Sequence, residues 1–472
     1  MSLLRDTVLS AVSSAVTVGG RMVVTVMLAR GLAPDAYGQF VFMQWVIELS
    51  GLICSLGVGG SMSRFLPSLP AGGPRLRAPL MRFFLLHGTL SLALSAAAFA
   101  VYLAVAQKPG AAAFAVLIGW SVLALLSTFM TAALQGLFRY DAVTVGNTVF
   151  VGAAFLAVWR LPSSIENAAI AMALAYAVGT LASLSVCALR RGARRTVAPP
   201  APPNIRSVMT YGLNTWITGL LATLVWSRGE FAVLKWHLHS RDIAIYSAAL
   251  SLNGAVATGA GLLTGALTPH LAGHAGAGDR DRIRTILEGV TQAVMMCTAA
   301  VAIGLIATGG SIVPLLLGPK YRESYDVLSI LAISGVSVSL GCAYTILQIE
   351  LHGRFGRNLN LVSLVLLLTI SAGLTSVIGV LGGAIARLTA QLAASGLILW
   401  RLRHIDFLNR SAGRIGGALI SGTLLVAGFY GFMKAAAPGP VTAILAGAAV
   451  LAVCVLMIRL IIGQRLLAIA KL

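Results

Sequence analysis

Long apolar segments separated by short polar ones repeat along the whole chain. Each is about 20 residues long, which is the length that an α-helix needs to cross the hydrocarbon core of a bilayer. The segments of a spanning β-barrel would be about ten residues long and would alternate between apolar and polar positions, so the pattern predicts helices. We place fourteen apolar runs at 8–29, 40–61, 83–105, 113–134, 143–159, 168–189, 208–238, 243–271, 286–308, 326–350, 359–378, 382–400, 415–433 and 441–458.

The composition supports membrane helices. Hydrophobic residues make up 58% of the chain and charged residues only 10%, whereas about a quarter of a soluble domain is charged. This excludes an ordinary soluble enzyme, a disordered chain and a disulfide-stapled protein. The five cysteines are scattered without metal-ligand spacing, and no P-loop or hydrolase motif occurs. We therefore expect an all-α polytopic membrane protein with no enzymatic activity, no cofactor and no bound metal.

The basic residues indicate the orientation of the helices. The net charge of +20 would suggest a nucleic-acid partner in a soluble protein, but here most cations lie in short loops between apolar runs. If the N-terminus is cytoplasmic, 23 of the 34 lysines and arginines fall on the cytoplasmic side, 7 on the outer side and 4 within spans. The positive-inside rule then predicts that both termini are cytoplasmic. We expect membrane lipids as partners and no nucleic acid.

A proline-rich segment divides the chain after the sixth apolar run. Four arginines precede Ala-Pro-Pro-Ala-Pro-Pro at 198–203, and proline at this density cannot continue a helix. The predicted organisation is a first lobe of six spans (1–197), a cytoplasmic linker (198–207), a second lobe of six spans (208–409), and two further spans with a short C-terminal tail (410–472).

A weak internal repeat relates the two lobes. Aligning Tyr37 with Tyr246 gives an offset of 209 residues, and the same offset relates Arg21 to Glu230. Each lobe thus has an ionisable residue 16 positions before its tyrosine, about 12 Å inside the predicted outer helix end. Transporters built from repeats often bind their cargo at this depth.

Several loop and span-end segments resemble a known family. They follow one another with the family's spacing over nearly the whole chain and are similar to the oligosaccharide/O-antigen flippases of the multidrug/oligosaccharidyl-lipid/polysaccharide exporter superfamily. The segments are Ala29-Arg-Gly-Leu-Ala-Pro-Asp-Ala-Tyr-Gly-Gln-Phe40, Leu56-Gly-Val-Gly, Arg64-Phe-Leu-Pro67, Gly318-Pro-Lys-Tyr321 with Leu328-Ser-Ile-Leu331, and Leu381-Gly-Gly-Ala-Ile-Ala386.

The resemblance implies two six-helix lobes around a central cavity, with two added helices. It also implies an undecaprenyl-diphosphate-linked oligosaccharide as cargo, the bacterial inner membrane as the location, and a polysaccharide polymerase and glycosyltransferases as functional partners. Many relatives have an aspartate in the seventh span where this chain has Glu230, so a carboxylate is retained.

Charged residues inside the first two spans are candidate site residues, because an ionisable side chain near the bilayer centre costs at least about 2.5–3.5 kcal/mol unless it faces water or a partner. Arg21 and Glu48 reach similar depths on consecutive antiparallel spans. One interpretation is a buried ion pair that fixes helix packing. The other is that Arg21 binds the cargo diphosphate through its planar guanidinium and that Glu48 holds it when the site is empty.

The seventh and twelfth spans carry the remaining candidates. Arg228 and Lys235 are seven residues apart and share a helix face. Glu230 points away from Arg228 on a regular helix, unless Gly229 permits a local break. We expect a cationic surface for the diphosphate and a carboxylate for coupling. The alternative for Lys235 is that it snorkels to the outer interface. The alternatives for Arg387 are that it faces the cavity or the outer headgroups.

Other functions remain open. A peptidoglycan lipid-precursor flippase belongs to the same superfamily, as does a drug/cation antiporter. An antiporter should have an acidic cavity because its cargo is cationic, whereas here the cations within spans outnumber the carboxylates. A polymerase or ligase would need a large outer loop, and the longest outer connection is at 309–325.

Overall fold

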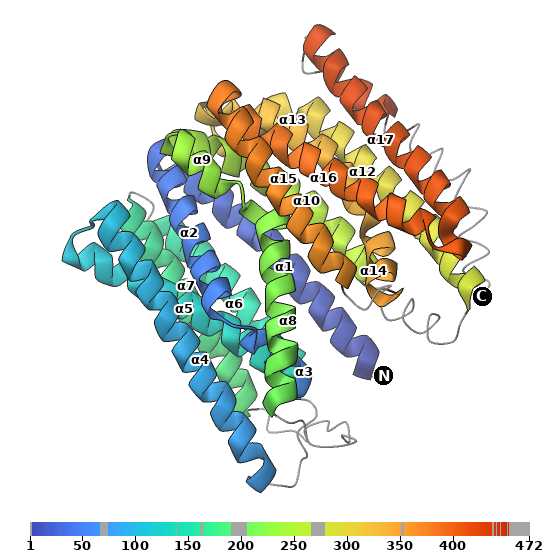
Figure 1. Cartoon of the computed structure of the whole chain (residues 1–472). Helices are drawn as coiled ribbons and strands as arrows, with labels where there is room; N and C mark the ends of the chain where they lie inside the picture. Colours follow the sequence, from blue (N-terminus) through green and yellow to red (C-terminus); the bar gives the residue numbers. More distant parts are fainter. Residues whose placement is uncertain are drawn as a thin grey trace. The chain divides into compact units, whose positions relative to one another are not determined.

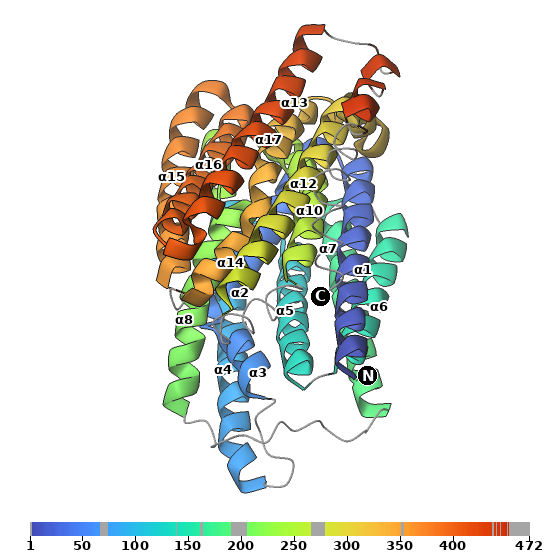
Figure 2. The same cartoon turned by 90° about the vertical axis from the view of Figure 1, so that its right-hand side faces the viewer.

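A computed structural model describes residues 2–66, 74–137, 139–160, 164–189, 205–265, 279–350 and 354–436, together with 439, 441–443, 445–450 and 452. All regular elements in these residues are helices, as the apolar runs predict (Figures 1 and 2). The chain forms two compact units, Met1–Leu220 and Leu221–Leu472. The Pro-rich segment 198–203 lies outside the described residues.

The first unit consists of eight α-helices and one π-helical turn among its described residues, where α8 runs three residues past the unit boundary. They are α1 (Ser2–Gly31), α2 (Pro34–Cys54), α3 (Val58–Phe65), α4 (Pro74–Tyr102), the π-helix η1 (Leu103–Gln107), α5 (Ala111–Gly136), α6 (Tyr140–Arg160), α7 (Ile165–Leu189) and α8 (Ile205–Thr223).

Close helix packing in the first unit depends on small residues. Gly146 of α6 faces the Ser183 side chain of α7, and Gly179 of α7 faces the backbone of α6 at Gly146 and Phe150. Each glycine lies where a Cβ atom would overlap the opposite helix. Such small residues let membrane helices approach closely enough for extensive van der Waals contact.

The second span is bent by 62° between α2 and α3. Gly57 has a φ of 80°, a left-handed conformation that glycine adopts at little cost, and it packs directly on the backbone of Gly212 in α8. The bend frees the Leu52 carbonyl, which accepts a hydrogen bond of 2.8 Å from the Trp216 indole. Ser61 donates to the Val208 carbonyl at 3.2 Å. Helix α8, the first half of the seventh apolar run, therefore stabilises the bend through these two hydrogen bonds.

The second unit begins within the seventh apolar run. Its described helices are the π-helix η2 (Leu224–Arg228), α9 (Phe231–His237), α10 (Ser240–Gly265), α12 (Arg280–Leu317), η3 (Pro319–Tyr321), α13 (Ser324–Gly335), η4 (Val336–Leu340), α14 (Gly341–Glu350), α15 (Arg354–Ile378), α16 (Val380–Arg403), η5 (Asp406–Leu408) and α17 (Asn409–Ala436).

The hydrophobic core of the second unit lies between α12, α14, α16 and α17, with aliphatic residues such as Ile303, Leu347 and Ile415 fully buried. Both views show α17 running along α12 (Figures 1 and 2). Polar contacts hold α17 at its two ends. Near its start, Glu288 of α12 binds Ser411 and Arg414, and near its end Lys434 pairs with Asp326 of α13 at 2.6 Å.

In the described part of the chain, ten helices are long and apolar enough to span a membrane, or eleven if the bent pair α2 and α3 counts as one span. The predicted runs 8–29 and 243–271 overlap α1 and α10, although 266–271 lie outside the described residues. The short apolar helix Val441–Val450 covers part of the last run. The chain is thus an all-helical, many-spanning protein, while the count of fourteen and the orientation of the termini stay predictions.

Candidate functional site

The seventh apolar run is interrupted where it carries its charges. The chain is π-helical over Leu224–Arg228, turns at Gly229 and Glu230, and resumes as α9. A Cβ atom at Gly229 would collide with the Leu224 carbonyl oxygen, so this position requires glycine. Such a π-bulge frees backbone groups from the regular helical pattern and is frequent at functional sites. The local break that Gly229 was expected to permit is therefore present.

The break brings Glu230 together with residues of two other helices. Its Oε1 accepts a hydrogen bond from the Tyr246 hydroxyl of α10 at 2.6 Å and pairs with Arg387 Nη1 of α16 at 2.5 Å. Arg387 Nη2 donates to the Trp226 carbonyl, also at 2.5 Å. Glu230 is 0% and Arg387 4% exposed. The pair is thus deeply buried and connects α16 to the break.

This network answers the question that the sequence leaves open for Arg387. Its guanidinium faces neither headgroups nor solvent, because it forms an ion pair with Glu230 and a hydrogen bond with the backbone carbonyl of Trp226 in the break. The other carboxylate oxygen of Glu230, Oε2, is buried and has no hydrogen-bond partner among the described residues. The two charges neutralise each other, so the local charge depends on the remaining arginine, Arg228.

Arg228 makes fewer polar contacts than Arg387, the other arginine near the break. It is half-buried, and its guanidinium carbon lies 5.5 Å from the centre of the Phe231 ring. Its Nη1 is buried without a hydrogen-bond partner in the part of the chain that the structure describes. Buried guanidinium nitrogens are normally hydrogen-bonded, so Arg228 has free capacity to bind an anion. Two arginines against one carboxylate leave the cluster with a net charge of +1.

Lys235 lies in the last turn of α9. It is half-buried, and its Nζ donates to Ser240 Oγ at 3.1 Å across the turn that leads into α10. Neighbouring Trp236 is 87% exposed. An exposed tryptophan next to a lysine is typical of the interfacial end of a span.

In the first unit, Arg21 of α1 and Glu48 of α2 are both exposed. The Arg21 guanidinium carbon lies 5.9 Å from the centre of the Phe150 ring, and Glu48 accepts a hydrogen bond from Gln44 at 3.0 Å. Helix α2 packs against both α1 and α7. The described residues show no ion pair between Arg21 and Glu48.

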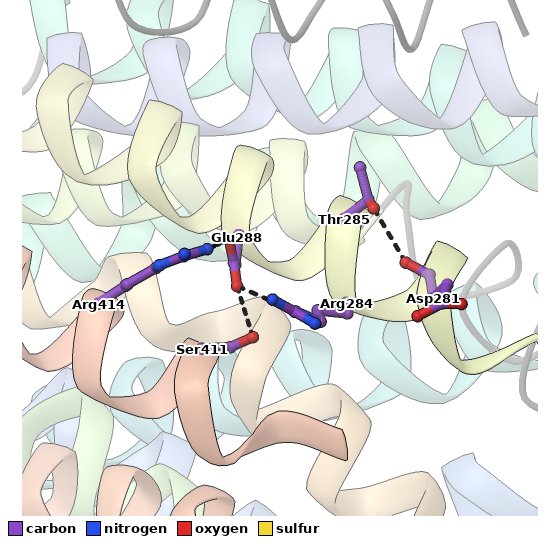
Figure 3. Close-up of polar contacts among 6 residues, drawn as sticks. All are labelled: Asp281, Arg284, Thr285, Glu288, Ser411 and Arg414. Atoms are coloured by element: carbon purple, nitrogen blue, oxygen red, sulfur yellow. Dashed lines mark hydrogen bonds and ion pairs between the residues drawn. The ribbon is translucent and has the colours of Figure 1, made fainter.

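A second polar cluster lies where α12 and α17 begin (Figure 3). Glu288 accepts hydrogen bonds from Ser411 at 2.6 Å, Arg414 at 3.1 Å and Arg284 at 3.4 Å. Asp281 uses its backbone carbonyl to accept from Thr285. These three donors come from the same two helices, so the cluster explains how α17 is held against α12. The described residues contain no group of acidic, histidine or cysteine side chains that could hold a metal ion.

Sequence reasoning identified Glu230 and Arg387 separately but missed that they form a pair, and it missed Tyr246 as their partner. A signal for Tyr246 was present, since the repeat singled out this tyrosine 16 residues after Glu230. No local signal exists for the Trp226 carbonyl, because its availability depends on the π-helical break.

The described part of the chain is thus a many-spanning helical membrane protein with a buried ion pair at the break in its seventh apolar run. Residues 3–273, more than half of the chain, match the family described as polysaccharide biosynthesis protein, and the chain belongs to this family. The resemblance inferred from the loop segments is therefore confirmed. No curated protein matches the sequence significantly.

Solved structures share the fold at low sequence identity. Lipid II flippase MurJ in an inward closed conformation has a TM-score of 0.64 at 10% identity, covering 97% of this chain and 99% of its own. An inward-facing MATE-family multidrug resistance transporter of the MOP superfamily has a TM-score of 0.61 at 14% identity and covers 84% and 96%. A MOP superfamily transporter from Pyrococcus furiosus has 0.61 at 15%, covering 86% and 96%.

Proposed function

We propose that this protein is a bacterial inner-membrane flippase that moves undecaprenyl-diphosphate-linked oligosaccharide repeat units for surface polysaccharide biosynthesis. Membership of the polysaccharide biosynthesis family and the MOP-type transporter fold support this proposal. The structural observation that carries it is Arg228, a cation at membrane depth whose Nη1 is buried without a partner among the described residues.

The cargo's diphosphate presents the main energetic problem of such a reaction. Moving an unpaired anion into an apolar environment costs far more than thermal energy. A guanidinium offsets this cost because it forms paired, charge-assisted hydrogen bonds with phosphate oxygens. Arg228 can supply such bonds without giving up an existing partner. In contrast, Arg387 would have to leave a buried carboxylate uncompensated, which is strongly unfavourable.

We therefore assign different roles to the four candidate cations. Arg228 and Arg21 bind the diphosphate directly. Arg387 compensates Glu230 and keeps the local charge positive, while Lys235 attracts the anion near the outer interface. Glu230, with its free Oε2, is the residue we propose for coupling.

Alternating access completes the proposed mechanism. Arg21 and Glu48 are exposed although they lie well within their spans, and charged side chains at such depth face water rather than lipid. A hydrated lumen holds the sugars while the prenyl tail stays in the bilayer. Opening of this lumen first to the cytoplasmic side and then to the outer side moves the headgroup across.

A peptidoglycan-precursor flippase is the second candidate, and the similarity in fold to Lipid II flippase MurJ favours it. A multidrug antiporter fits less well, because its cationic cargo would meet a charge cluster of net +1 around Glu230. The TM-scores of 0.64 to Lipid II flippase MurJ and 0.61 to the MATE-family transporter are close, so a phenotype has to separate the candidate functions.

The test is deletion of the gene followed by complementation. We expect the deletion strain to lose surface polysaccharide and to remain viable, whereas lysis would indicate peptidoglycan-precursor transport. Wild type and Arg322→Ala, which changes an exposed loop arginine, should restore the polymer. Arg228→Ala should fail at equal protein level in the membrane fraction. Full restoration by both Arg228→Ala and Arg21→Ala would overturn the assigned roles.

A further inference from the structure

Four helices of the first unit bring a mixed polar and aromatic group together. Phe150 of α6 and Tyr176 of α7 form a ring pair with centroids 4.6 Å apart. Arg21 of α1 lies beside the Phe150 ring, and α2, which carries Glu48, packs against both α1 and α7. Gln44, one turn before Glu48 on α2, donates to its carboxylate.

Glu48 is unusual within this group. It lies near the middle of the bent pair Pro34–Phe65, and it is exposed. Gln44 is its hydrogen-bond partner, and the described residues show no salt bridge from Glu48 to a cation. A charged side chain within a span has to face water or a partner, and Glu48 is exposed without a cationic partner among the described residues, so a role in helix packing does not account for it. At least two of the four lone-pair positions of the Glu48 carboxylate remain free to accept hydrogen bonds.

A carboxylate here also works against binding of a diphosphate, because like charges repel strongly in a site of reduced dielectric constant. Glu48 offsets the charge of Arg21, so this group as a whole is neutral, unlike the cluster around Arg228. The part of the cargo that Glu48 meets should therefore carry hydrogen-bond donors and no negative charge. A sugar ring next to the phosphate has this character.

We propose that Glu48, Gln44 and Tyr176 form a subsite for the first sugar of the cargo, the one attached to the diphosphate. This inference rests on the proposed flippase function. The carboxylate accepts hydrogen bonds from sugar hydroxyl groups, and the Gln44 amide holds the carboxylate in place and adds a second polar contact. The negative face of the tyrosine ring attracts the C–H face of a pyranose. Arg21, beside the same aromatic pair, binds the adjoining phosphate.

The subsite gives the two units different tasks. The cluster around Arg228 binds any prenyl diphosphate, whereas the group around Glu48 distinguishes one first sugar from another. Hydrogen bonds to a charged group contribute enough to change a rate by about tenfold or more. A variant that lacks Glu48 should therefore lose discrimination among cargos, whereas a variant that lacks Arg228 should lose transport of all of them.

The experiment uses the full-length protein reconstituted in phospholipid vesicles. The probes are fluorescent undecaprenyl diphosphate without a sugar and the same lipid carrying a single N-acetylglucosamine, glucose or galactose. Wild type, Glu48→Leu, Gln44→Ala and Tyr176→Leu are compared, with Glu323→Leu as the matched control because Glu323 is exposed and lies outside the candidate spans. Transbilayer movement is measured by chemical quenching of the outer leaflet.

For Glu48→Leu we expect the best sugar-bearing probe to slow by about tenfold or more relative to the sugar-free probe. Tyr176→Leu should change the order of preference among the three sugars, and the control should leave all ratios as in wild type. Equal slowing of every probe, or unchanged ratios in all three variants, would overturn the subsite while leaving the flippase proposal intact. A wild-type protein that moves no probe would overturn both.

Discussion

The buried pair between Glu230 and Arg387 gives the sharpest prediction about stability. In Arg387→Met, a side chain of similar length loses its charge and its hydrogen bonds to Glu230 and to the Trp226 carbonyl. The carboxylate that remains is 0% exposed. Removal of one partner of a buried ion pair costs about 3–5 kcal/mol, because the other charge is left uncompensated.

A double variant separates this cause from a loss of packing. Replacing a buried ion pair by neutral side chains of similar volume is often nearly neutral in free energy. Arg387→Met combined with Glu230→Gln should therefore recover at least about 2 kcal/mol of the loss, a coupling energy within the range seen for residues in direct contact. Tyr246 can still donate its hydroxyl to the glutamine carbonyl.

The assay is unfolding of the purified protein in detergent, by heat and by denaturant. A loss of 3–5 kcal/mol corresponds to a decrease in Tm of at least about 6 °C for a unit of this size. Arg241→Met is the matched control, because it breaks an Arg–Glu pair of 3.1 Å whose side chains are 54% and 65% exposed. Such a pair contributes about 0–1 kcal/mol. Equal effects of Arg387→Met and Arg241→Met, or a double variant no more stable than the single one, would refute the reasoning.

Two further variants test the helix contacts. Gly57→Ala should lower the Tm by several degrees, because it places a Cβ atom at a φ of 80° against the backbone of Gly212. Gly59→Ala is the control and should lower the Tm only slightly, because a Cβ atom there meets ordinary contact distances. Equal Tm values for the two variants would show that the bend is not constrained. Glu288→Ala should cost about 2–3 kcal/mol, because it removes a buried carboxylate that accepts from the buried Ser411 hydroxyl. Exposed Glu323→Ala should cost less than 1 kcal/mol, and a reversed order would contradict the role of this cluster.

The helical fold was predictable because apolar runs of spanning length have few alternatives in a bilayer. Local sequence also indicated the break at Gly229, since a glycine among charged residues within a span interrupts both packing and hydrophobicity. The π-helical form of that break was not predictable. Within it the Trp226 carbonyl accepts a hydrogen bond from Arg387, a residue 161 positions away that local sequence does not reveal.

The candidate site was predictable as a set of residues and not as an arrangement. The high cost of a charge within a span identifies Arg228, Glu230 and Arg387 individually. Which arginine neutralises Glu230 depends on how α16 packs beside the break, and single-sequence depth estimates say nothing about helix rotation. For the same reason, matched depth suggested an ion pair between Arg21 and Glu48, whereas both side chains are exposed.

The two arginines near the break differ in how their charge is balanced, because Arg387 is paired with Glu230 and Arg228 is not paired with a carboxylate among the described residues. Arg387 and Glu230 hold α16 to the break without adding net charge, so in the proposed mechanism the cargo does not have to compete for them. Arg228 remains available because its position on the π-helix places it over Phe231 rather than next to a carboxylate. In the proposed mechanism, structural and cargo-binding roles are therefore carried by different arginines within one small region.

Transbilayer movement in reconstituted vesicles tests the central claim most directly. Fluorescent undecaprenyl diphosphate carrying a complete oligosaccharide repeat is supplied on one side, and its appearance on the other side is measured for wild type, Arg228→Ala and Arg322→Ala. The account predicts rapid movement for wild type and Arg322→Ala and near-background movement for Arg228→Ala. Movement by Arg228→Ala at the wild-type rate, or none by the wild-type protein, would contradict it.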